Sequence, residues 1–224
     1  MPRPSTVLFD LDGTLVDTAP DFVLCLNQQR ERHGLPPLPE PQIRRVVSNG
    51  GRALVKTGFG LNPDDPEFAR YLDELLDLYQ THLASCSGLF PGMDNLLTWL
   101  EQQRVPWGVV TNKPSRFTLP LLEKLELASR CAVTVCPDHV EERKPHPESL
   151  LLACSRIGVS PTGGIYVGDH ERDIEAGRRA GMLTVAVRYG YLEHPEVIDA
   201  WDADYTAEDA AALLEWLQRR TEAA

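Results

Sequence analysis

Short apolar runs and amphipathic stretches alternate along most of the second half of the chain. Each run has the length and composition of a buried strand, and each stretch repeats its apolar residues every three or four positions, as a helix packed on one face does. The expected strands are 6–9, 105–110, 132–136, 164–167 and 183–187, and the expected helices are 93–103, 116–127, 148–157, 171–180 and 206–219. This order predicts an α/β fold, in which helices cross between the strands of a parallel sheet.

The stretch 18–87 follows a different pattern. Strand signals are absent there, and apolar residues recur at helical spacing, most clearly in Leu72, Leu75, Leu76, Tyr79 and Leu83. A segment rich in glycine and proline then leads back to the alternating pattern, as is typical of a domain boundary. We therefore expect a helical cap domain, 18–87, inserted into a core domain made of 1–17 and 88–224, with hinges near Val16-Asp17 and Ser87-Gly88.

Charge and composition narrow the classes of function. Lys and Arg number 22 against 33 Asp and Glu, so the formal charge is -11 and most of the surface would repel a polyanion such as nucleic acid. The N-terminal region has no apolar stretch long enough for a signal peptide or a membrane span. The five cysteines are scattered and form no CxxC pair. We therefore expect a cytoplasmic protein without disulfides, structural zinc, or nucleic-acid and membrane partners.

Two carboxylates directly follow the first predicted strand. The sequence Asp10-Leu11-Asp12-Gly13-Thr14 places Asp10 and Asp12 at the carboxyl edge of the sheet, where parallel α/β folds bind their ligands. Two acids one residue apart, with a glycine that permits a sharp turn, suit a nucleophile and a proton donor beside a shared metal ion. The same Asp-Gly sequence also occurs in turns that only begin a helix.

Three later loops of the predicted sheet also carry polar residues. Thr111 and Asn112 close a buried strand ahead of a helix, where phosphate binds well, although ordinary helix capping uses the same residues. Lys144 precedes another helix and is able to hold a phosphate oxygen near the two acids. Asp169 follows a further strand, Asp173 lies one helical turn on, and such oxygen ligands suit Mg²⁺. Helix caps and surface charges explain each element singly, but their joint occurrence at one sheet edge favours a catalytic site.

Together these motifs resemble those of the haloacid dehalogenase superfamily, in its subgroup with a helical cap inserted after the first motif. The resemblance covers essentially the whole chain, and the matching segments are Asp10–Thr14, Thr111-Asn112, Lys144-Pro145 and Gly168–Asp173. It implies a Rossmann-like parallel sheet core. It also implies a phosphoryl transfer in which Asp10 is the nucleophile and Asp12 acts as general acid and then as general base.

The resemblance further implies how the phosphate and a metal ion are held. Thr111 and Lys144 would stabilise the phosphate and the covalent intermediate, with Asn112 beside them. Mg²⁺ would be held by Asp10, the backbone carbonyl of Asp12, and Asp169. Asp173 would not bind the metal directly but would support the residues that do.

Within the superfamily, the chain is similar to two groups of bacterial phosphatases, which act on N-acetylmuramic acid 6-phosphate and on 2-phosphoglycolate. The first resemblance rests on stretches such as Trp107–Pro114 and Ala186–Tyr191. It implies that the substrate is a small phosphorylated metabolite. The expected substrate is N-acetylmuramic acid 6-phosphate of peptidoglycan recycling, and the alternative is 2-phosphoglycolate.

The turn Ser48-Asn49-Gly50-Gly51-Arg52 in the cap has two interpretations. As a substrate-specificity loop, it would bring Asn49, Gly50 and the Arg52 guanidinium against a sugar or a carboxylate. As an ordinary connection it would join two helices, and Arg52 would be a surface cation. The roles of Arg188, His139 and His170 are similarly open.

Three other classes of protein share part of this motif set. A haloacid dehalogenase has no use for a second acid, so the presence of Asp12 argues against that reaction. A phosphomutase would differ in its cap and in its need for a bisphosphate activator. A non-catalytic phospho-accepting module would have no reason for a helical insertion of this length. Hydrolysis of a phosphate ester is therefore the expected reaction, while the oligomeric state is left open.

Overall fold

The computed structural model describes residues 3–222, and its centre is a six-stranded sheet. Every neighbouring pair is parallel, and the strands lie in the order β5 (Val133–Val135), β4 (Trp107–Val110), β1 (Val7–Phe9), β6 (Ile165–Gly168), β7 (Leu183–Val187) and β8 (Tyr205–Ala207). The strand order reverses beside β1, and such a switch point is where open α/β sheets bind their ligands. The predicted α/β class with a parallel sheet is confirmed.

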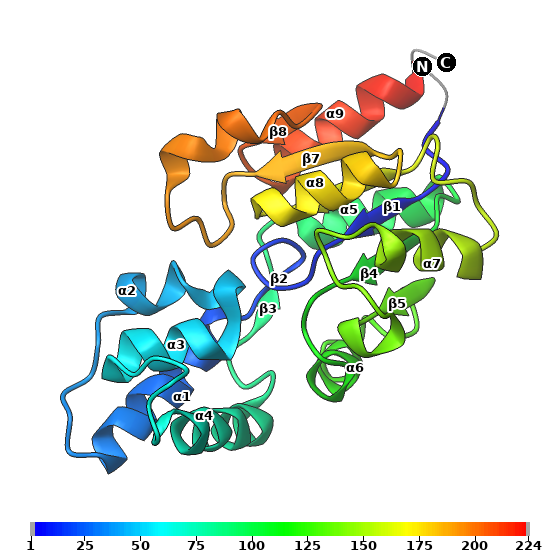
Figure 1. Ribbon diagram of the computed structural model, residues 1–224. Coiled ribbons are helices and arrows are strands. Elements are labelled where there is room, and N and C mark those ends of the chain that lie inside the picture. The colour runs from blue at the N-terminus through cyan, green and yellow to red at the C-terminus, as the bar shows by residue number, and fades with distance from the viewer. Residues whose placement is uncertain (1–2, 223–224) are drawn as a thin grey trace.

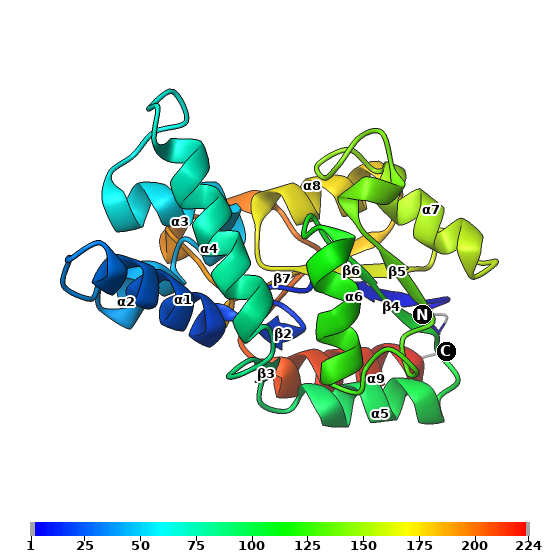
Figure 2. The same cartoon turned by 90° about the horizontal axis from the view of Figure 1, so that it is seen from below.

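Helices cover both faces of this sheet (Figure 1, Figure 2). One face carries α7 (Glu148–Arg156) and α8 (Glu171–Arg179), and the other carries α5 (Met93–Gln102), α6 (Ser115–Lys124) and α9 (Ala210–Glu222). Successive strand residues point to opposite faces, so Val7 and Phe9 of β1 pack into one apolar cluster and Leu8 into another. This double burial explains the uninterrupted apolar runs of the sequence.

A separate group of helices lies at one end of the molecule, between β1 and β4 in the chain (Figure 1). It consists of α1 (Ala19–Arg32), α2 (Glu40–Arg44), a 3-10 turn η1 (Val47–Asn49), α3 (Gly50–Phe59) and α4 (Phe68–His82). Helix α4 buries Leu75 and Tyr79 of the predicted apolar face, while Leu72 and Leu76 of that face are only partly buried. Leu78, which was not in the predicted set, is buried as well. We call this group, from α1 to α4, the helical insertion.

Two short strands connect the helical insertion to the sheet. β2 (Val16–Asp17) and β3 (Gly88–Leu89) pair antiparallel, so the chain leaves and returns at one place. The buried carboxylate of Asp21, in the first turn of α1, accepts backbone hydrogen bonds of 2.8 and 2.7 Å from the return segment 84–87, and a third from its Ser87 hydroxyl. Asp21 thereby fixes the return segment to the start of α1.

The C-terminal region differs from its prediction. The expected helix 206–219 begins only at Ala210, and Tyr205–Ala207 form the edge strand β8. The Tyr205 ring stacks on Trp216 of α9 at 4.9 Å, so β8 shares the apolar face of the helix and its residues fit the helical pattern. A 3-10 helix, η3 (Pro195–Trp201), also has no counterpart in the prediction.

The cysteines and helices also bear on the expected environment of the protein. All five cysteines are free, as their scattered positions predict. Within residues 3–222, no helix combines the length and the apolar character that crossing a membrane requires.

Candidate active site

The residues predicted to take part in catalysis lie together at the carboxyl ends of three adjacent strands. β1 lies between β4 and β6 in the sheet, so Asp10, directly after β1, emerges between Thr111 and Asp169. All three side chains are buried. Lys144 reaches the same place from the loop before α7. The structure therefore brings together residues that are separated by up to 159 positions in the sequence, from Asp10 to Asp169.

Lys144 lies between two of the acidic side chains. Its Nζ is 3.0 Å from Asp10 Oδ1 and 2.7 Å from Asp173 Oδ1, and it donates a hydrogen bond to the Tyr166 hydroxyl at 2.7 Å. Burial alone would raise the pKa of Asp10, but the facing Lys144 ammonium lowers this pKa below its usual value. Burial would lower the pKa of Lys144, but the two carboxylates raise it. Asp10 is thus held as a carboxylate, the form that a nucleophile needs.

Asp169 faces other carboxylates. Burial, followed by the charges of Asp10 and Asp173, raises the pKa of Asp169 to about 7. One ligand oxygen from each of these three acids lies within 4.8 Å of the others, and Asp10 Oδ1 accepts no hydrogen bond of good geometry from the described residues. Three buried, crowded carboxylates with an unsatisfied oxygen fit a divalent cation, which would neutralise them.

Glycines in two distant loops enclose Asp169. Its Oδ2 accepts the Tyr191 N–H at 2.9 Å, and its Oδ1 accepts the Thr14 hydroxyl at 3.4 Å. A Cβ at Gly13 would lie 2.1 Å from Asp169 Oδ2, and one at Gly190 would lie 2.2 Å from the Asp169 Cβ. Gly13 also has a φ of +81°. Only glycine fits these two positions, which explains the Gly13 of the first motif.

Asp12 has surroundings different from those of Asp10. Its Oδ1 accepts hydrogen bonds from the Thr18 hydroxyl at 2.5 Å and from Lys113 Nζ at 2.9 Å. Its side chain retains 16% exposure, whereas that of Asp10 retains 8%. The two acids of the first motif therefore lie against two different lysines, and Asp12 is the more accessible of the pair.

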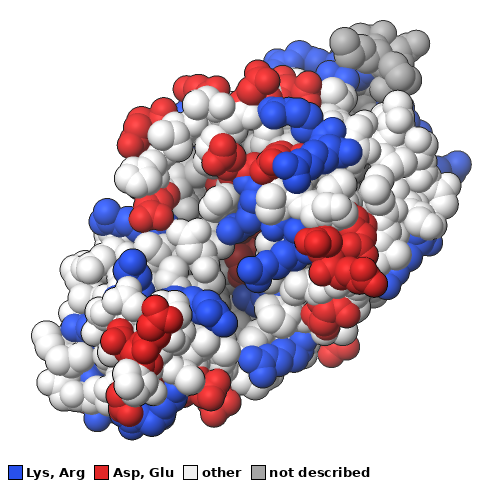
Figure 3. Space-filling model, in the orientation of Figure 1, with Lys and Arg blue, Asp and Glu red and all other residues white. Residues whose placement is uncertain are grey.

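A cavity of about 850 Å³ opens beside Asp10 and Asp12, between the helical insertion and the sheet edge. Its lining includes six basic side chains: Arg52, Lys113, Arg116, Arg143, Lys144 and Arg172. Figure 3 shows Lys and Arg atoms gathered across the middle of this face, with acidic atoms in the hollow behind them. Both lysines are paired with acids, whereas the four arginines form no ion pair within residues 3–222. This cavity fits an anionic ligand.

The turn before α3 reaches across this cavity to the core. The Ser48 hydroxyl donates a hydrogen bond to Asp169 Oδ2 at 2.8 Å. The Arg172 guanidinium, on α8, donates to the Ser48 carbonyl. The helical insertion therefore contacts one of the carboxylates that fit a metal ion.

The family follows from a comparison with protein-family models. Residues 7–187 match the model for haloacid dehalogenase-like hydrolases. The chain belongs to the haloacid dehalogenase-like hydrolase family. This match contains all four motifs of the sequence analysis and the whole helical insertion.

Three relatives of this hydrolase align over nearly their full lengths. The N-acetylmuramic acid 6-phosphate phosphatase of Pseudomonas aeruginosa is 50% identical over 97% of this chain and 96% of the relative. The protein of the same name from Pseudomonas putida is 46% identical over 94% of this chain and 95% of the relative. A phosphoglycolate phosphatase of Xanthomonas campestris pv. campestris is 42% identical, with 95% and 96% covered.

A solved structure has the same architecture as this hydrolase. The crystal structure of a predicted phosphoglycolate phosphatase from Haemophilus somnus aligns with a TM-score of 0.84 at 28% sequence identity. The alignment covers 96% of this chain and 99% of that chain. The likeness therefore includes the helical insertion as well as the sheet.

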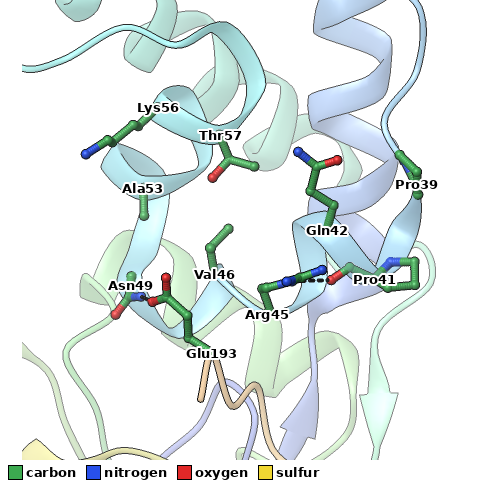
Figure 4. Close-up of a pocket in the computed structure, with 10 residues that line it drawn as sticks. All are labelled: Pro39, Pro41, Gln42, Arg45, Val46, Asn49, Ala53, Lys56, Thr57 and Glu193. Carbon is green, nitrogen blue, oxygen red and sulfur yellow. Dashed lines mark hydrogen bonds between the residues drawn. The ribbon is translucent and has the colours of Figure 1, made fainter. Parts of the chain in front are cut away.

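The predicted binding residues of the turn, Asn49, Gly50 and Arg52, all line the cavity that holds Asp10. Asn49 donates a hydrogen bond to Glu193 at 3.1 Å, at the edge of a second hollow of about 700 Å³ between α2 and α3 (Figure 4). Gly50, with a φ of +78°, begins α3, and the exposed Arg52 lines the cavity that holds Asp10. The lining of the second hollow contains neither acid of the first motif, so this hollow is separate from the chemistry.

Three candidates with open roles have local contacts in this hydrolase. Arg188 pairs with two exposed acids. His139 accepts a backbone N–H from the preceding turn. His170 accepts the Arg172 N–H at 3.2 Å and begins α8. Burial, and then the neighbouring Arg172, lowers the pKa of His170 to about 4, so the ring is neutral, as this acceptor role requires.

Four residues of the site were not singled out from the sequence. Three of them donate hydrogen bonds to a predicted acid: Lys113 to Asp12, and Ser48 and Tyr191 to Asp169. The fourth, Arg172, donates to the carbonyl of Ser48. Three of the four lie in or beside segments named in the sequence analysis: Lys113 directly follows the Thr111-Asn112 motif, Ser48 begins the turn of the cap, and Arg172 lies within Gly168–Asp173. The contacts of Ser48, Arg172 and Tyr191 depend on how the helical insertion and a C-terminal loop pack on the sheet edge.

Proposed function

We propose that this phosphoric monoester hydrolase acts on N-acetylmuramic acid 6-phosphate, through an aspartyl phosphate formed on Asp10. One observation carries the proposal. The Asp10 carboxylate and the more accessible Asp12, which are one residue apart in the first motif, both line the basic cavity. A nucleophile and a proton donor are thereby available to one bound phosphate ester.

The proposed first step uses both acids of the first motif. Asp10, as the carboxylate, attacks phosphorus, and the bond from phosphorus to the ester oxygen breaks. The departing alkoxide takes the proton that Asp12 carries in the substrate complex, which leaves Asp12 as a carboxylate. Water then attacks the phosphorus of the aspartyl phosphate and gives its proton to Asp12. The bond from phosphorus to the Asp10 oxygen breaks, inorganic phosphate leaves, and both carboxyl groups return to their starting states.

The proposed phosphate cradle consists of Thr111, Asn112 and Lys144. Thr111 is 3% exposed and lines the cavity, and Asn112 donates a hydrogen bond to the Lys144 carbonyl at 3.1 Å. The Lys144 ammonium beside Asp10 would offset the repulsion between a carboxylate nucleophile and an anionic phosphate. Cap residues Asn49, Gly50 and Arg52 form the facing wall.

The proposed metal is Mg²⁺, held by Asp10, the backbone carbonyl of Asp12, and Asp169. Hard oxygen donors and the crowded carboxylates of this site support a small divalent cation. When bound, Mg²⁺ would supply positive charge that neutralises the phosphate oxygens during attack. Asp173, which accepts hydrogen bonds from Lys144 and from the His170 N–H, supports the arrangement from behind.

Three features support the amino-sugar substrate. The relatives with 50% and 46% identity carry that name, whereas the phosphoglycolate phosphatase of Xanthomonas campestris pv. campestris is 42% identical. The cavity of about 850 Å³ has room for a sugar ring with substituents. Its unpaired arginines, of which Arg52 lies on the helical insertion, suit a carboxylate such as the lactyl group of the sugar. 2-Phosphoglycolate also carries a carboxylate and is the alternative substrate.

The organisation of the chain completes the proposal. The core would comprise 1–17 and 88–224, and 18–87 would act as a cap that closes over the cavity and excludes water. We also propose a cytoplasmic location, which the free cysteines support because reducing compartments keep thiols unpaired.

Phosphate release from a panel of esters tests the proposed function. The panel contains N-acetylmuramic acid 6-phosphate, 2-phosphoglycolate and several hexose phosphates, each with Mg²⁺ and with EDTA. We expect a preference of about 10²-fold in kcat/KM for the first, which corresponds to about 2.7 kcal/mol. A preference for 2-phosphoglycolate would replace the substrate, and no Mg²⁺-dependent release would overturn the reaction.

Asp10→Asn tests the nucleophile. The amide cannot attack phosphorus, so turnover should fall to background, by about 10⁴-fold or more, while the circular dichroism spectrum is unchanged. Asp64→Asn, which changes an exposed carboxylate that does not line the cavity, is the matched control. Substantial activity of Asp10→Asn would contradict an aspartyl phosphate on this residue.

A further inference from the structure

Lys113 is a buried cation that the proposed reaction does not use. Its side chain is 6% exposed, and its Nζ lies 2.9 Å from Asp12 Oδ1. Its backbone is fixed on both sides, because its N–H donates to the Thr111 hydroxyl at 3.2 Å and its carbonyl accepts from the Thr118 hydroxyl at 3.1 Å. Its position is therefore set by the end of β4 and the start of α6.

Aromatic rings of the helical insertion lie around the same ammonium. Lys113 Nζ is 4.5 Å from the ring centre of Tyr79 on α4 and 5.0 Å from that of Phe22 on α1. These two rings stack on each other at 4.0 Å with an interplanar angle of 3°. Both distances are within the range of cation–π attraction. Lys113 therefore connects the Asp12 carboxylate of the core with two helices of the insertion.

The contacts of Asp12 indicate what this connection does. Thr18 and Lys113 both bind Oδ1, and within residues 3–222 no hydrogen bond falls on Oδ2. Two donors on one oxygen fix the rotation of the carboxyl group and leave the second oxygen for proton transfer. A buried ammonium requires a partner of opposite charge, and Asp12 is the acid with which Lys113 forms an ion pair.

We propose that Lys113 is a positioning residue for Asp12, and that it ties the placement of this acid to the seating of the helical insertion on the core. The inference rests on the proposed function, since the proton transfer by Asp12 belongs to it. With the insertion seated, the Phe22 and Tyr79 rings hold the ammonium against Asp12. When the insertion moves away, the ammonium loses the rings and the carboxyl group loses its fixed orientation.

Lys113→Met tests the proposal through the leaving group of the substrate. Single-turnover rates are measured with p-nitrophenyl phosphate and with the sugar phosphate that the wild type hydrolyses best. An alkoxide needs the proton of Asp12 to depart, whereas p-nitrophenolate departs without it. We expect a loss of about 10²-fold for the sugar phosphate, under about tenfold for p-nitrophenyl phosphate, and KM within about threefold for both.

Two other patterns would overturn the proposal. Equal losses for both substrates with a raised KM would make Lys113 a phosphate ligand, and unchanged rates would make it a structural ion pair. Lys56→Met removes the same charge from an exposed position on α3, so it should change neither rate. Wild-type protein that hydrolyses no ester at all would refute the proposed function instead, so the two failures are distinguishable.

Phe22→Leu tests the connection to the helical insertion and serves if Lys113→Met does not fold. This change removes one ring and leaves the ion pair between Lys113 and Asp12 in place. We expect a selective loss of about three- to tenfold for the sugar phosphate, with p-nitrophenyl phosphate less affected. Equal rates of Phe22→Leu and wild type on both esters would refute the role of the insertion.

Discussion

Lys144 is the residue on which the buried charges of the site depend. Lys144→Met would leave Asp10 and Asp173 facing each other without the cation between them. Removal of one partner from a buried ion pair typically costs about 3–5 kcal/mol. We therefore expect the thermal midpoint of the metal-free protein to fall by roughly 10 °C, at about 2–4 °C per kcal/mol.

Calorimetry in EDTA measures this effect. The double variant Lys144→Met with Asp173→Asn removes one of the two stranded carboxylates, so it should recover part of the lost stability. A single variant as stable as the wild type would show that the two carboxylates do not need this cation.

Asp169 makes the stability of the metal-free protein depend on pH. Its pKa is raised from 3.8 to about 7, first by burial and then by Asp10 and Asp173. The folded protein holds this proton more tightly than the unfolded chain does. The contribution of Asp169 to stability is therefore complete below about pH 4 and is lost as the pH rises through about 7. In EDTA, wild type should lose stability relative to Asp169→Asn across this window.

Thermal unfolding at a series of pH values measures that difference. Saturating Mg²⁺ should reduce it, because a cation bound among the carboxylates stabilises their ionised forms. Asp64→Asn controls for the loss of an exposed carboxylate and should follow the wild-type profile. If, in EDTA, the thermal midpoint of the wild type instead rises relative to that of Asp169→Asn as the pH increases, the expected destabilisation by ionised Asp169 is contradicted.

At the residue scale, the sequence indicates the acids together with Lys144 and Asp173. It does not indicate the hydrogen bonds that Lys113, Ser48 and Tyr191 donate to the acids, or the contact of Arg172 with Ser48. Asp10, Thr111 and Asp169 were predictable because each directly follows an apolar strand, and the ends of parallel strands meet at one edge. The contact from Ser48 to Asp169 joins residues 121 positions apart, through a turn whose placement no local pattern encodes. The pairing of Lys113 with Asp12 likewise depends on side-chain direction, not on spacing.

At the scale of elements, Asp21 is the feature that holds the return segment of the helical insertion. Asp21→Ala would leave the N–H donors of the segment 84–87 without their acceptor. Such unpaired groups cost about 1–3 kcal/mol each when they stay buried, so the segment should open instead. Hydrogen exchange of these amides should become faster by about tenfold or more.

Mass spectrometry of peptides that contain 84–87 measures this exchange. Asp77→Ala, at an exposed position on α4, is the control and should leave the exchange unchanged. Equal protection of the segment in Asp21→Ala and the wild type would show that the linker is held by other contacts.

The elements themselves were predictable to different degrees. Strands buried on both faces give uninterrupted apolar runs, so β4, β6 and β7 agree with their predictions within two residues. The edge strand β8 buries only its last residue and packs against the apolar stripe of α9, so its pattern resembles the start of a helix. The degree of burial therefore separates the strands of the six-stranded sheet that were predicted from the one that was missed.

At the scale of the whole molecule, a chain with a formal charge of -11 presents a cavity lined by four arginines and two lysines. This local field should attract an anionic ester, and salt should weaken the attraction because the Debye length falls to about 8 Å near physiological ionic strength. We expect KM to rise about three- to tenfold between about 0.02 and 0.3 M NaCl, with kcat changed by less than about twofold.

Initial-rate kinetics at several NaCl concentrations measure this response. Arg52→Gln should flatten it and should raise KM more for an ester with a carboxylate than for one without. Lys56→Gln, on the same helix but outside the cavity that holds Asp10, is the control. A KM that is independent of salt would argue that the arginines do not attract the substrate.

The fold class and the presence of an inserted helical segment were predictable from the sequence, whereas the contacts between the insertion and the core were not. Alternating strands and helices indicate a parallel sheet, and the uniformly helical stretch after the first strand indicates an insertion. How closely that insertion sits on the core depends on single contacts such as Arg172 to Ser48 and Asn49 to Glu193. Such contacts arise from the packed tertiary structure, which local propensity does not describe.

The glycines around Asp169 have a consequence for laboratory evolution of this enzyme. Any side chain at Gly13 or Gly190 would overlap the Asp169 carboxylate or its Cβ, so variants at these two sites are lost from a library whatever substrate is selected. The opposite wall is built from side chains such as Leu72 and Leu76 of α4 and Arg52 of α3. Randomising that wall alone would explore new specificities while the chemistry is inherited unchanged.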